Sequence, residues 1–226
     1  MTGLLRKAML FACAGVLAAS SAMAAVPSPA DSDVPCGINL VGTHSGTADS
    51  HGTFSIVVRD LAHNPIAGSA VVIDFNSCVA AGNVQDIRVC STQAVTGVTA
   101  NCAGVVGSIN AVTDGSGTIT IAVIGGAKNT APHTPGTGFK CATVYADGVN
   151  LGNVNVGAFD ENGVGGVNPA DVSVMINDSL DFAGSAVYRG RSDFNCTNSV
   201  NPADISLELG VSLGFLSLTS CGTYCH

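Results

Sequence analysis

Apolar and polar residues alternate in short runs through the middle of the chain, and clusters of turn residues separate the runs. The runs are rich in Val, Ile and Thr, which favour extended strands, and none shows a helical period. The expected strands cover residues 38–41, 54–60, 69–75, 86–90, 105–111, 117–123, 140–145 and 153–158. This succession of short strands predicts a mainly β fold, a β-sandwich made of residues 36–158.

Two turn-and-strand segments carry a family resemblance. The Asn64-Pro65 turn leads through Gly68 into a strand with Val71, Ile73 and Phe75 on one face, and Thr113, Asp114 and Gly117 open a later strand. These segments resemble bacterial immunoglobulin-like domains of the invasin or intimin type. The resemblance implies an immunoglobulin-like sandwich with exposed loops, and it implies no ligand. Residues 125–139, rich in Gly, Pro and Thr, are expected to form a flexible loop, and His44 and His51 are expected in a solvated one.

Near the C-terminus, the apolar residues of two runs have the spacing of a helix. The apolar residues at helical spacing are Val172, Met175, Ile176 and Leu180 in the first run, and Ile205, Leu209 and Leu213 in the second. Pro169 and Pro202 stand just before these runs, where a helix tolerates a missing N–H. We therefore expect two short helices, each of which buries the apolar face just named.

A duplicated twelve-residue pattern leads into these helices, at residues 160–171 and 193–204. Both copies have oxygen-bearing side chains at positions 1, 3, 9 and 12, the spacing of an EF-hand-type calcium loop, because calcium takes six to eight oxygen ligands. Gly165 and Asn198 at position 6 suit the sharp turn of such a loop. The candidate ligands are Asp160, Asn162, Gly166, Asn168 and Asp171 in the first loop, and Asp193, Asn195, Thr197, Ser199, Asn201 and Asp204 in the second. Gly166 and Ser199 would offer backbone carbonyls.

The two loops with their single following helices resemble a type I dockerin, the duplicated calcium-binding module that docks onto cohesins. The resemblance covers residues 159–226, and it implies calcium as cofactor and an extracellular or cell-surface protein, cohesin-like or not, as partner. By the same resemblance, Ser173, Asn177 and Ser206 on the helices would contact that partner. The chain departs from the family pattern in two places: Val164 offers no ligand at position 5, and positions 10 and 11 are Pro-Ala in both copies.

The N-terminus predicts export. Arg6 and Lys7 precede an apolar run at residues 8–19, and small residues at 22–24 suit signal-peptide cleavage, which would leave a short segment at residues 25–35 before the sandwich. Without the signal, six basic residues stand against sixteen acidic ones, a formal charge of −10. That charge argues against nucleic acid as a partner, and no run of apolar residues predicts membrane insertion.

Eight cysteines would remain after cleavage, and an even number in an exported chain favours disulfides. Close spacing makes Cys78 with Cys90 and Cys221 with Cys225 the first pairs to expect, although eight cysteines allow 105 pairings. Zinc is the competing interpretation, but the chain has no Cys-x-x-Cys or His-x-x-x-His spacing.

The chain shows no phosphate-binding glycine loop and no His-Glu-x-x-His motif. The sequence therefore predicts a secreted, non-catalytic binding or assembly protein. Two alternatives stay open: an extracellular polysaccharide-acting or carbohydrate-binding accessory protein, and a structural cell-surface protein in which calcium only stabilises the C-terminus. An acid pair in a cleft would favour a glycoside hydrolase, but the distance between two carboxylates is a property of the fold.

Overall fold

Strands make up most of the regular structure. The computed structural model describes residues 25–41, 43–44, 47–48, 51–80, 84–89, 99–100, 107–127, 140–163, 167–184 and 190–214. Its strands are β1 Gly37–Leu40, β2 Thr43–His44, β3 Thr47–Ala48, β4 Thr53–Val57, β5 Ala70–Asp74, β6 Val84–Val89, β7 Thr99–Ala100, β8 Ser108–Val112, β9 Thr118–Ala127, β10 Ala142–Ala146 and β11 Val149–Ala158. All eight predicted strands are present, which confirms the mainly β prediction.

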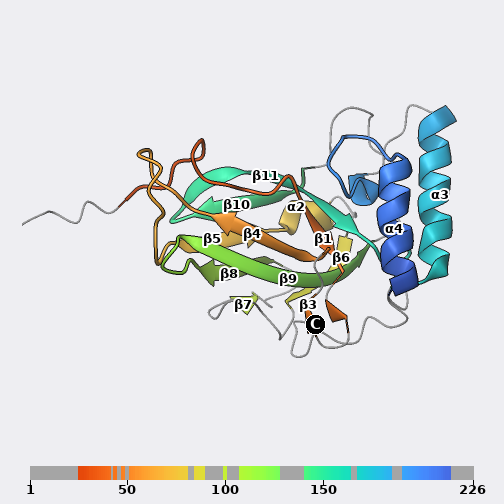
Figure 1. Ribbon diagram of the computed structural model, residues 1–226, viewed down its shortest axis with the longest axis horizontal. Helices are drawn as coiled ribbons and strands as arrows, with labels where there is room; N and C mark the ends of the chain where they lie inside the picture. The colour runs from red at the N-terminus through yellow and green to blue at the C-terminus, as the bar shows by residue number, and fades with distance from the viewer. Residues whose placement is uncertain are drawn as a thin grey trace, which may run out of the picture.

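The strands form two main sheets (Figure 1). One has six strands in the order β1-β11-β10-β5-β8-β7, and the other has three in the order β4-β9-β6; β2 and β3 form a separate pair. β1 pairs with β11 in parallel, whereas β10 pairs with both β11 and β5 in antiparallel fashion. Because β1 joins the sheet beside β11, the first and last strands of this domain lie next to each other at the end that carries the C-terminal helices.

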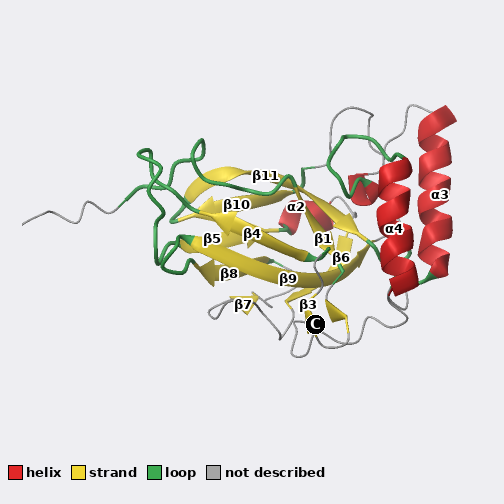
Figure 2. Cartoon of the chain, viewed as in Figure 1, coloured by secondary structure: helices red, strands yellow, loops and turns green. Residues whose placement is uncertain are grey.

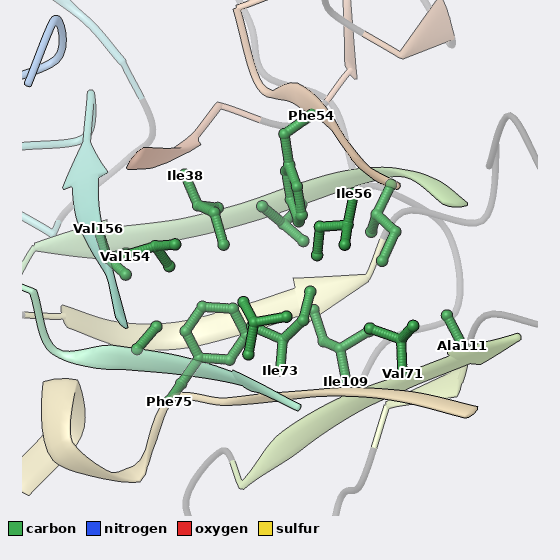
Figure 3. Close-up of a cluster of buried hydrophobic side chains, with 14 of the residues drawn as sticks. Ile38, Phe54, Ile56, Val71, Ile73, Phe75, Ile109, Ala111, Val154 and Val156 are labelled. Carbon is green, nitrogen blue, oxygen red and sulfur yellow. The ribbon is translucent and has the colours of Figure 1, made fainter. Parts of the chain in front are cut away.

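The main hydrophobic core lies between the two sheets, as Figure 3 shows. In β4, Phe54 and Ile56 point into it, while Ser55 between them is exposed and its hydroxyl lies 2.8 Å from that of Thr120 on β9. Such alternation places every second side chain of a strand on one face of a sheet. The period-two pattern of the sequence is therefore the pattern of burial.

A tight hairpin that the sequence analysis missed joins β10 to β11. Asp147 and Gly148 are the two residues between the strands, with φ of 48° and 82°. Positive φ at both positions is what a type I′ turn requires, and an Asp-Gly pair is a strong signal for it. The Asp147 carboxylate also accepts hydrogen bonds from Ser69 Oγ at 2.8 Å and Ala70 N at 2.9 Å, which fix the turn to β5.

The helices are α2 Asn76–Ala80, α3 Pro169–Gly184 and α4 Pro202–Gly214, with a 3-10 turn, η1, at Gly190–Ser192. α3 and α4 lie side by side at one end of the sheets (Figure 2). Both expected helices are present with a proline as their first residue. In the part of the chain that the structure describes, no helix is long and apolar enough to cross a membrane.

The expected buried face of these helices is partly wrong. Met175 is buried, but Ile176, Leu180, Leu209 and Leu213 are exposed. Asp171 and Asp204 lie inside their loops at the start of each helix, and residues four positions apart share a helix face. The inward face one turn later is therefore that of Met175 and Glu208, and the neighbouring apolar residues point outward.

Two disulfides join parts of the chain that are distant in sequence. Cys78 of α2 pairs with Cys141 beside β10, and Cys36 before β1 pairs with Cys196 in the second loop. The predicted Cys78–Cys90 bond is therefore wrong, because α2 places the Cys78 side chain in the core against Cys141. The predicted Cys221–Cys225 bond lies outside the described residues, as does the expected loop beyond residue 127.

Candidate metal centre

Each loop ends in a capped helix. Asn168 Oδ1 accepts a hydrogen bond from Ala170 N, and Asn201 Oδ1 accepts one from Ala203 N, both at 2.9 Å. Asparagine is among the best N-cap residues because its side chain satisfies an N–H that the helix leaves free. Position 9 of both loops thus caps a helix, and in EF-hand loops this position often reaches the ion through a water molecule.

The carboxylate at position 12 holds each loop closed in the same way. Asp171 accepts hydrogen bonds from the backbone N–H groups of Asn162 at 3.0 Å and Asn168 at 2.8 Å. In the second loop, Asp204 accepts them from Asn195 at 3.1 Å and Asn201 at 3.0 Å. The bonded residues are positions 3 and 9 in both copies, so the repeated sequence forms a repeated structure.

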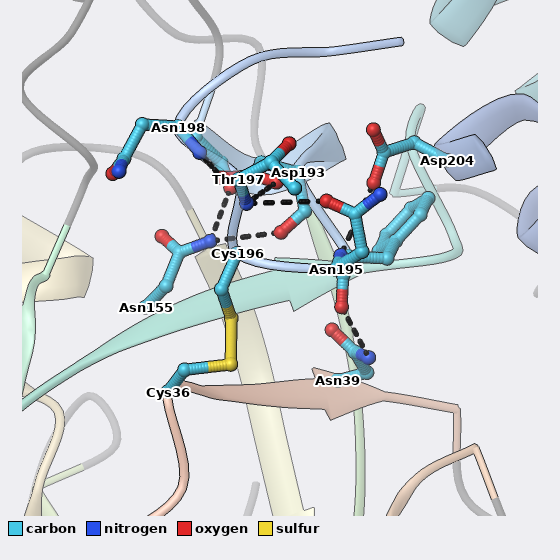
Figure 4. Close-up of a disulfide and its surroundings, with 11 residues drawn as sticks. Cys36, Asn39, Asn155, Asp193, Asn195, Cys196, Thr197, Asn198 and Asp204 are labelled. Atoms are coloured by element: carbon cyan, nitrogen blue, oxygen red, sulfur yellow. Dashed lines mark hydrogen bonds between the residues drawn. A yellow bond between two sulfur atoms is a disulfide. The ribbon is translucent and has the colours of Figure 1, made fainter. Parts of the chain in front are cut away.

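Hydrogen bonds connect several residues of the second loop (Figure 4). Asp193 accepts hydrogen bonds from Thr197 N and Asn198 N, both at 2.9 Å. The Asn201 amide nitrogen lies 2.9 Å from Thr197 Oγ1 and 3.1 Å from the Ser199 carbonyl oxygen. Oxygen atoms from positions 5 and 7 therefore converge on one polar group, as ligands of a cation would.

The first loop is described at both ends, while Val164, Gly165 and the candidate ligand Gly166 lie outside the described residues. Asp160 forms a parallel bridge with Gly126 near the end of β9. A Cβ atom on Gly126 would lie 3.0 Å from Gly163 Cα and 3.2 Å from Asp160 Oδ2, so a larger residue there would press against the loop. The loop therefore continues directly from β11 and contacts the three-stranded sheet.

A second, smaller core fixes the loops to the helices. Val167 and Val200, the apolar residues at position 8, are both buried in it with Met175 and Val211. Phe159 and Phe194 stack with ring centroids 4.1 Å apart, and Val41, which directly follows β1, joins the same cluster. The C-terminal module therefore shares a core with the chain that follows β1.

Among the described residues, every buried carboxylate belongs to this module. None of the six is more than 9% exposed, and Arg191 is the only buried basic residue among those that the structure describes. Its Nε lies 2.8 Å from Glu161 Oε2. The six carboxylates are those of Asp160, Glu161, Asp171, Asp193, Asp204 and Glu208. The burial of Glu161, Arg191 and Glu208 is not predicted from the sequence, because a charged residue is ordinarily expected to face solvent.

Burial and mutual repulsion raise the pKa of several of these carboxyl groups. Burial raises the pKa of Asp171 and of Asp204, and the neighbouring charges of Asp160 and Asp193 raise it further, although backbone N–H donors oppose the shift. Burial and the charges of Glu161, Asp171 and Asp160 raise the pKa of Glu208 to about 9. Neither carboxyl oxygen of Glu208 has a hydrogen-bond partner among the described residues.

The oxygen-rich composition of the loops fits calcium rather than a softer metal. Across the described residues, no group of three or more His, Cys, Asp or Glu side chains is placed to hold a metal ion. Among the candidate ligands, each loop has only two carboxylates, and the other side-chain oxygens come from Asn in the first loop and from Asn, Thr and Ser in the second. Calcium accepts such mixed sets of carboxylate, amide, hydroxyl and carbonyl oxygens at flexible geometry.

The expected partner-binding residues lie on the outside of the helices. Ser173, Asn177 and Ser206 are exposed, and the Ser206 hydroxyl donates a hydrogen bond to the Pro202 carbonyl at 2.9 Å. The exposed apolar residues come in pairs at equal positions of the repeat: Ile176 and Leu209 are 42% and 40% exposed, and Leu180 and Leu213 are 64% and 77% exposed. The sequence analysis had assigned these four residues to the core.

The chain matches no protein-family model, no curated protein and no solved structure. The two family resemblances therefore rest on the motifs quoted from the sequence.

Proposed function

We propose that residues 159–226 form a calcium-binding module with one ion in each loop, and that this module attaches the protein to another protein. The observation that carries the calcium part is the burial of six carboxylates beside a single arginine. Ionised groups taken out of water are costly unless opposite charge or hydrogen bonds compensate them. Two divalent cations would bring four positive charges to the two aspartate pairs, Asp160 with Asp171 and Asp193 with Asp204.

The duplicated apolar residues support the attachment part. The exposed apolar residues are Ile176 and Leu180 on α3 and Leu209 and Leu213 on α4. Exposed apolar patches often mark interaction sites. Neither helix contains Lys or Arg, whereas α3 contains Asp178 and Asp181. The partner we propose is therefore an extracellular protein with an apolar patch bordered by basic residues, and a cohesin is one such candidate.

The remaining parts of the proposal concern the strand domain and the location of the protein. Both disulfides suit an oxidising compartment outside the cytoplasm, in keeping with the predicted signal peptide. We assign the strand domain, residues 36–158, the immunoglobulin-like relationship suggested by its turn motifs. In this proposal it is a non-catalytic domain that carries the calcium module.

The direct test is a calcium titration of the full-length mature chain by isothermal calorimetry. The proposal expects two ions per chain in the wild type, and one in each of the variants Asp160→Ala and Asp193→Ala. Asp33→Ala, at an exposed aspartate of the segment before the strand domain, is the matched control and should keep both ions. Absence of calcium binding by the folded wild-type chain would refute the proposal.

A further inference from the structure

The second loop is tied to the strand domain by a covalent bond. Cys36, just before β1, forms a disulfide with Cys196, which is position 4 of the loop, across a sequence separation of 160 residues. Figure 4 shows this bond beside the side chains of the loop. A Cβ atom on Gly37 would lie 2.8 Å from Cys196 Sγ, so the loop approaches β1 too closely for any residue except glycine there.

The backbone at Cys196 is one that cysteine seldom adopts. Its φ is 58°, in the left-handed region, and the equivalent residue of the first loop is Gly163 with φ of 69°. Glycine adopts this conformation freely, whereas other residues are strained by their Cβ atom. The loop shape at position 4 favours glycine, but the second loop has Cys196 there. The side chain of Cys196 forms the disulfide with Cys36.

Asn155 on β11 adds a second link at the same place. Its amide nitrogen donates hydrogen bonds to the carbonyl oxygens of Gly190 at 2.9 Å and Asp193 at 3.0 Å, and its backbone N–H donates one to the Cys36 carbonyl at 3.0 Å. Asn155 is buried. One residue of the sheet therefore contacts both the half-cystine that holds position 4 and the backbone of the aspartate at position 1.

The first loop is held in a different way. It has glycine at position 4, and its contact with the strand domain is the backbone bridge between Asp160 and Gly126. A change at Cys36 or Asn155 can therefore act on one loop and leave the other intact. The two loops provide an internal comparison within a single chain.

We propose that Cys36 and Asn155 of the strand domain are positioning residues that hold the second loop in its cation-binding shape, so that its calcium affinity depends on the disulfide and on the Asn155 hydrogen bonds. This inference rests on the proposed function, because it concerns an ion in the second loop. A loop that is already ordered loses less conformational freedom when it binds. Groups that orient metal ligands commonly change metal affinity by about 10- to 100-fold.

The test uses the full-length mature chain with the Asp160→Ala change, which leaves the second loop as the one site to be measured with calcium chloride. In this background, Cys36→Ser with Cys196→Ser should weaken calcium binding at least about tenfold. The matched control is Cys78→Ser with Cys141→Ser, which removes the disulfide within the strand domain and should leave the affinity unchanged. Asn155→Ala keeps all cysteines and should also weaken binding.

The same changes in a chain with Asp193→Ala, where only the first loop remains, separate positioning from general damage to the fold. Calcium affinity of the first loop should not change. An equal loss in both backgrounds, or unchanged affinity of the second loop in a folded Cys36/Cys196 variant, would overturn the inference. If that variant does not fold, unchanged affinity in Asn155→Ala overturns it. Absence of binding by the wild type would overturn the proposed function as well, which distinguishes the two failures.

Discussion

Met175 and Glu208 occupy the same position of the two repeats, and both side chains are completely buried. Met175 fills the small core with apolar contacts, whereas Glu208 brings a carboxyl group toward Glu161, Asp171 and Asp160. The repeat is therefore symmetric in its backbone and asymmetric in its charge. Since a methionine fits the equivalent place, shape alone does not require a glutamate at position 208.

The first prediction is that the calcium-free protein becomes less stable as the pH rises from about 4.5 to about 9. In the folded state the pKa of Glu208 is raised from 4.5 to about 9, so between these values the folded chain binds more protons than the unfolded chain. The free energy of unfolding then falls with increasing pH. Thermal unfolding in chelator across this pH range measures the effect.

Glu208→Met supplies the control, because it copies the residue of the first repeat. It should raise the unfolding temperature at pH 8 in chelator, because an apolar side chain replaces a buried carboxyl group that has no hydrogen-bond partner among the described residues, and it should flatten the pH dependence. An unchanged pH profile in Glu208→Met would show that other groups cause it.

The second prediction is that calcium stabilises the whole chain rather than the C-terminal module alone. A ligand present at about 100 times its dissociation constant adds about 2.7 kcal/mol to the free energy of unfolding. For a chain of this size that corresponds to a rise of roughly 5–10 °C in the unfolding temperature. Because Cys36–Cys196 and Asn155 join the module to the sheet, scanning calorimetry should show one transition that moves with calcium. A strand-domain transition insensitive to chelator would contradict this.

The third prediction compares the two aspartates at position 12. Each accepts backbone hydrogen bonds from positions 3 and 9 of its loop, so Asp171→Ala and Asp204→Ala should lower stability similarly without calcium. With calcium, Asp204→Ala should lose more of the stabilisation, because the second loop has Thr197 at position 5 where the first has Val164. Unfolding temperatures of both variants, measured with calcium and with chelator, provide the four values needed. A larger calcium-dependent loss in Asp171→Ala would reverse the expected order of the two sites.

The strands and the loop-helix repeat were predictable from the sequence because each depends on local spacing. Alternation in segments such as residues 53–57 reports directly which face of a sheet is buried, and Pro169 and Pro202 mark helix starts. The Asp147-Gly148 hairpin was also readable, although it was overlooked. In these places neighbouring residues alone decide the backbone.

The disulfides and the inward faces of the helices depend on contacts between distant residues. Spacing suggested Cys78 with Cys90, but α2 turns Cys78 toward Cys141. Hydrophobicity assigned Leu209 to the core, although the start of α4 inside the loop directs Glu208 inward instead. No pattern in one helix reveals that a carboxylate will be buried against the other repeat. The buried charge that carries the proposed function therefore emerged only from the three-dimensional structure.

The fourth prediction is that the mature protein has no free thiol. Four of its eight cysteines form the two disulfides described, and export with an even number favours pairing of Cys90, Cys102, Cys221 and Cys225. Thiol titration of denatured, unreduced protein should give a value near zero, and the same titration after reduction should give eight. Several titratable thiols before reduction would count against an oxidising compartment.

The fifth prediction separates the outward apolar residues from the buried ones. Leu180→Gln and Leu213→Gln, singly or together, should change the free energy of unfolding by no more than about 0.5 kcal/mol each, because both side chains are largely exposed. Met175→Ala should cost about 2–5 kcal/mol, as for other buried side chains truncated to alanine. Urea unfolding in calcium measures all of these values.

If these exposed apolar residues serve attachment, the two leucine changes should reduce binding of the full-length chain to a partner without any loss of stability or of bound calcium. Because Leu180 and Leu213 are equivalent in the repeat, we expect each single change to be tolerated better than the double change. A loss of stability in the leucine variants comparable to that of Met175→Ala would mean that these side chains support the fold rather than a contact with another protein.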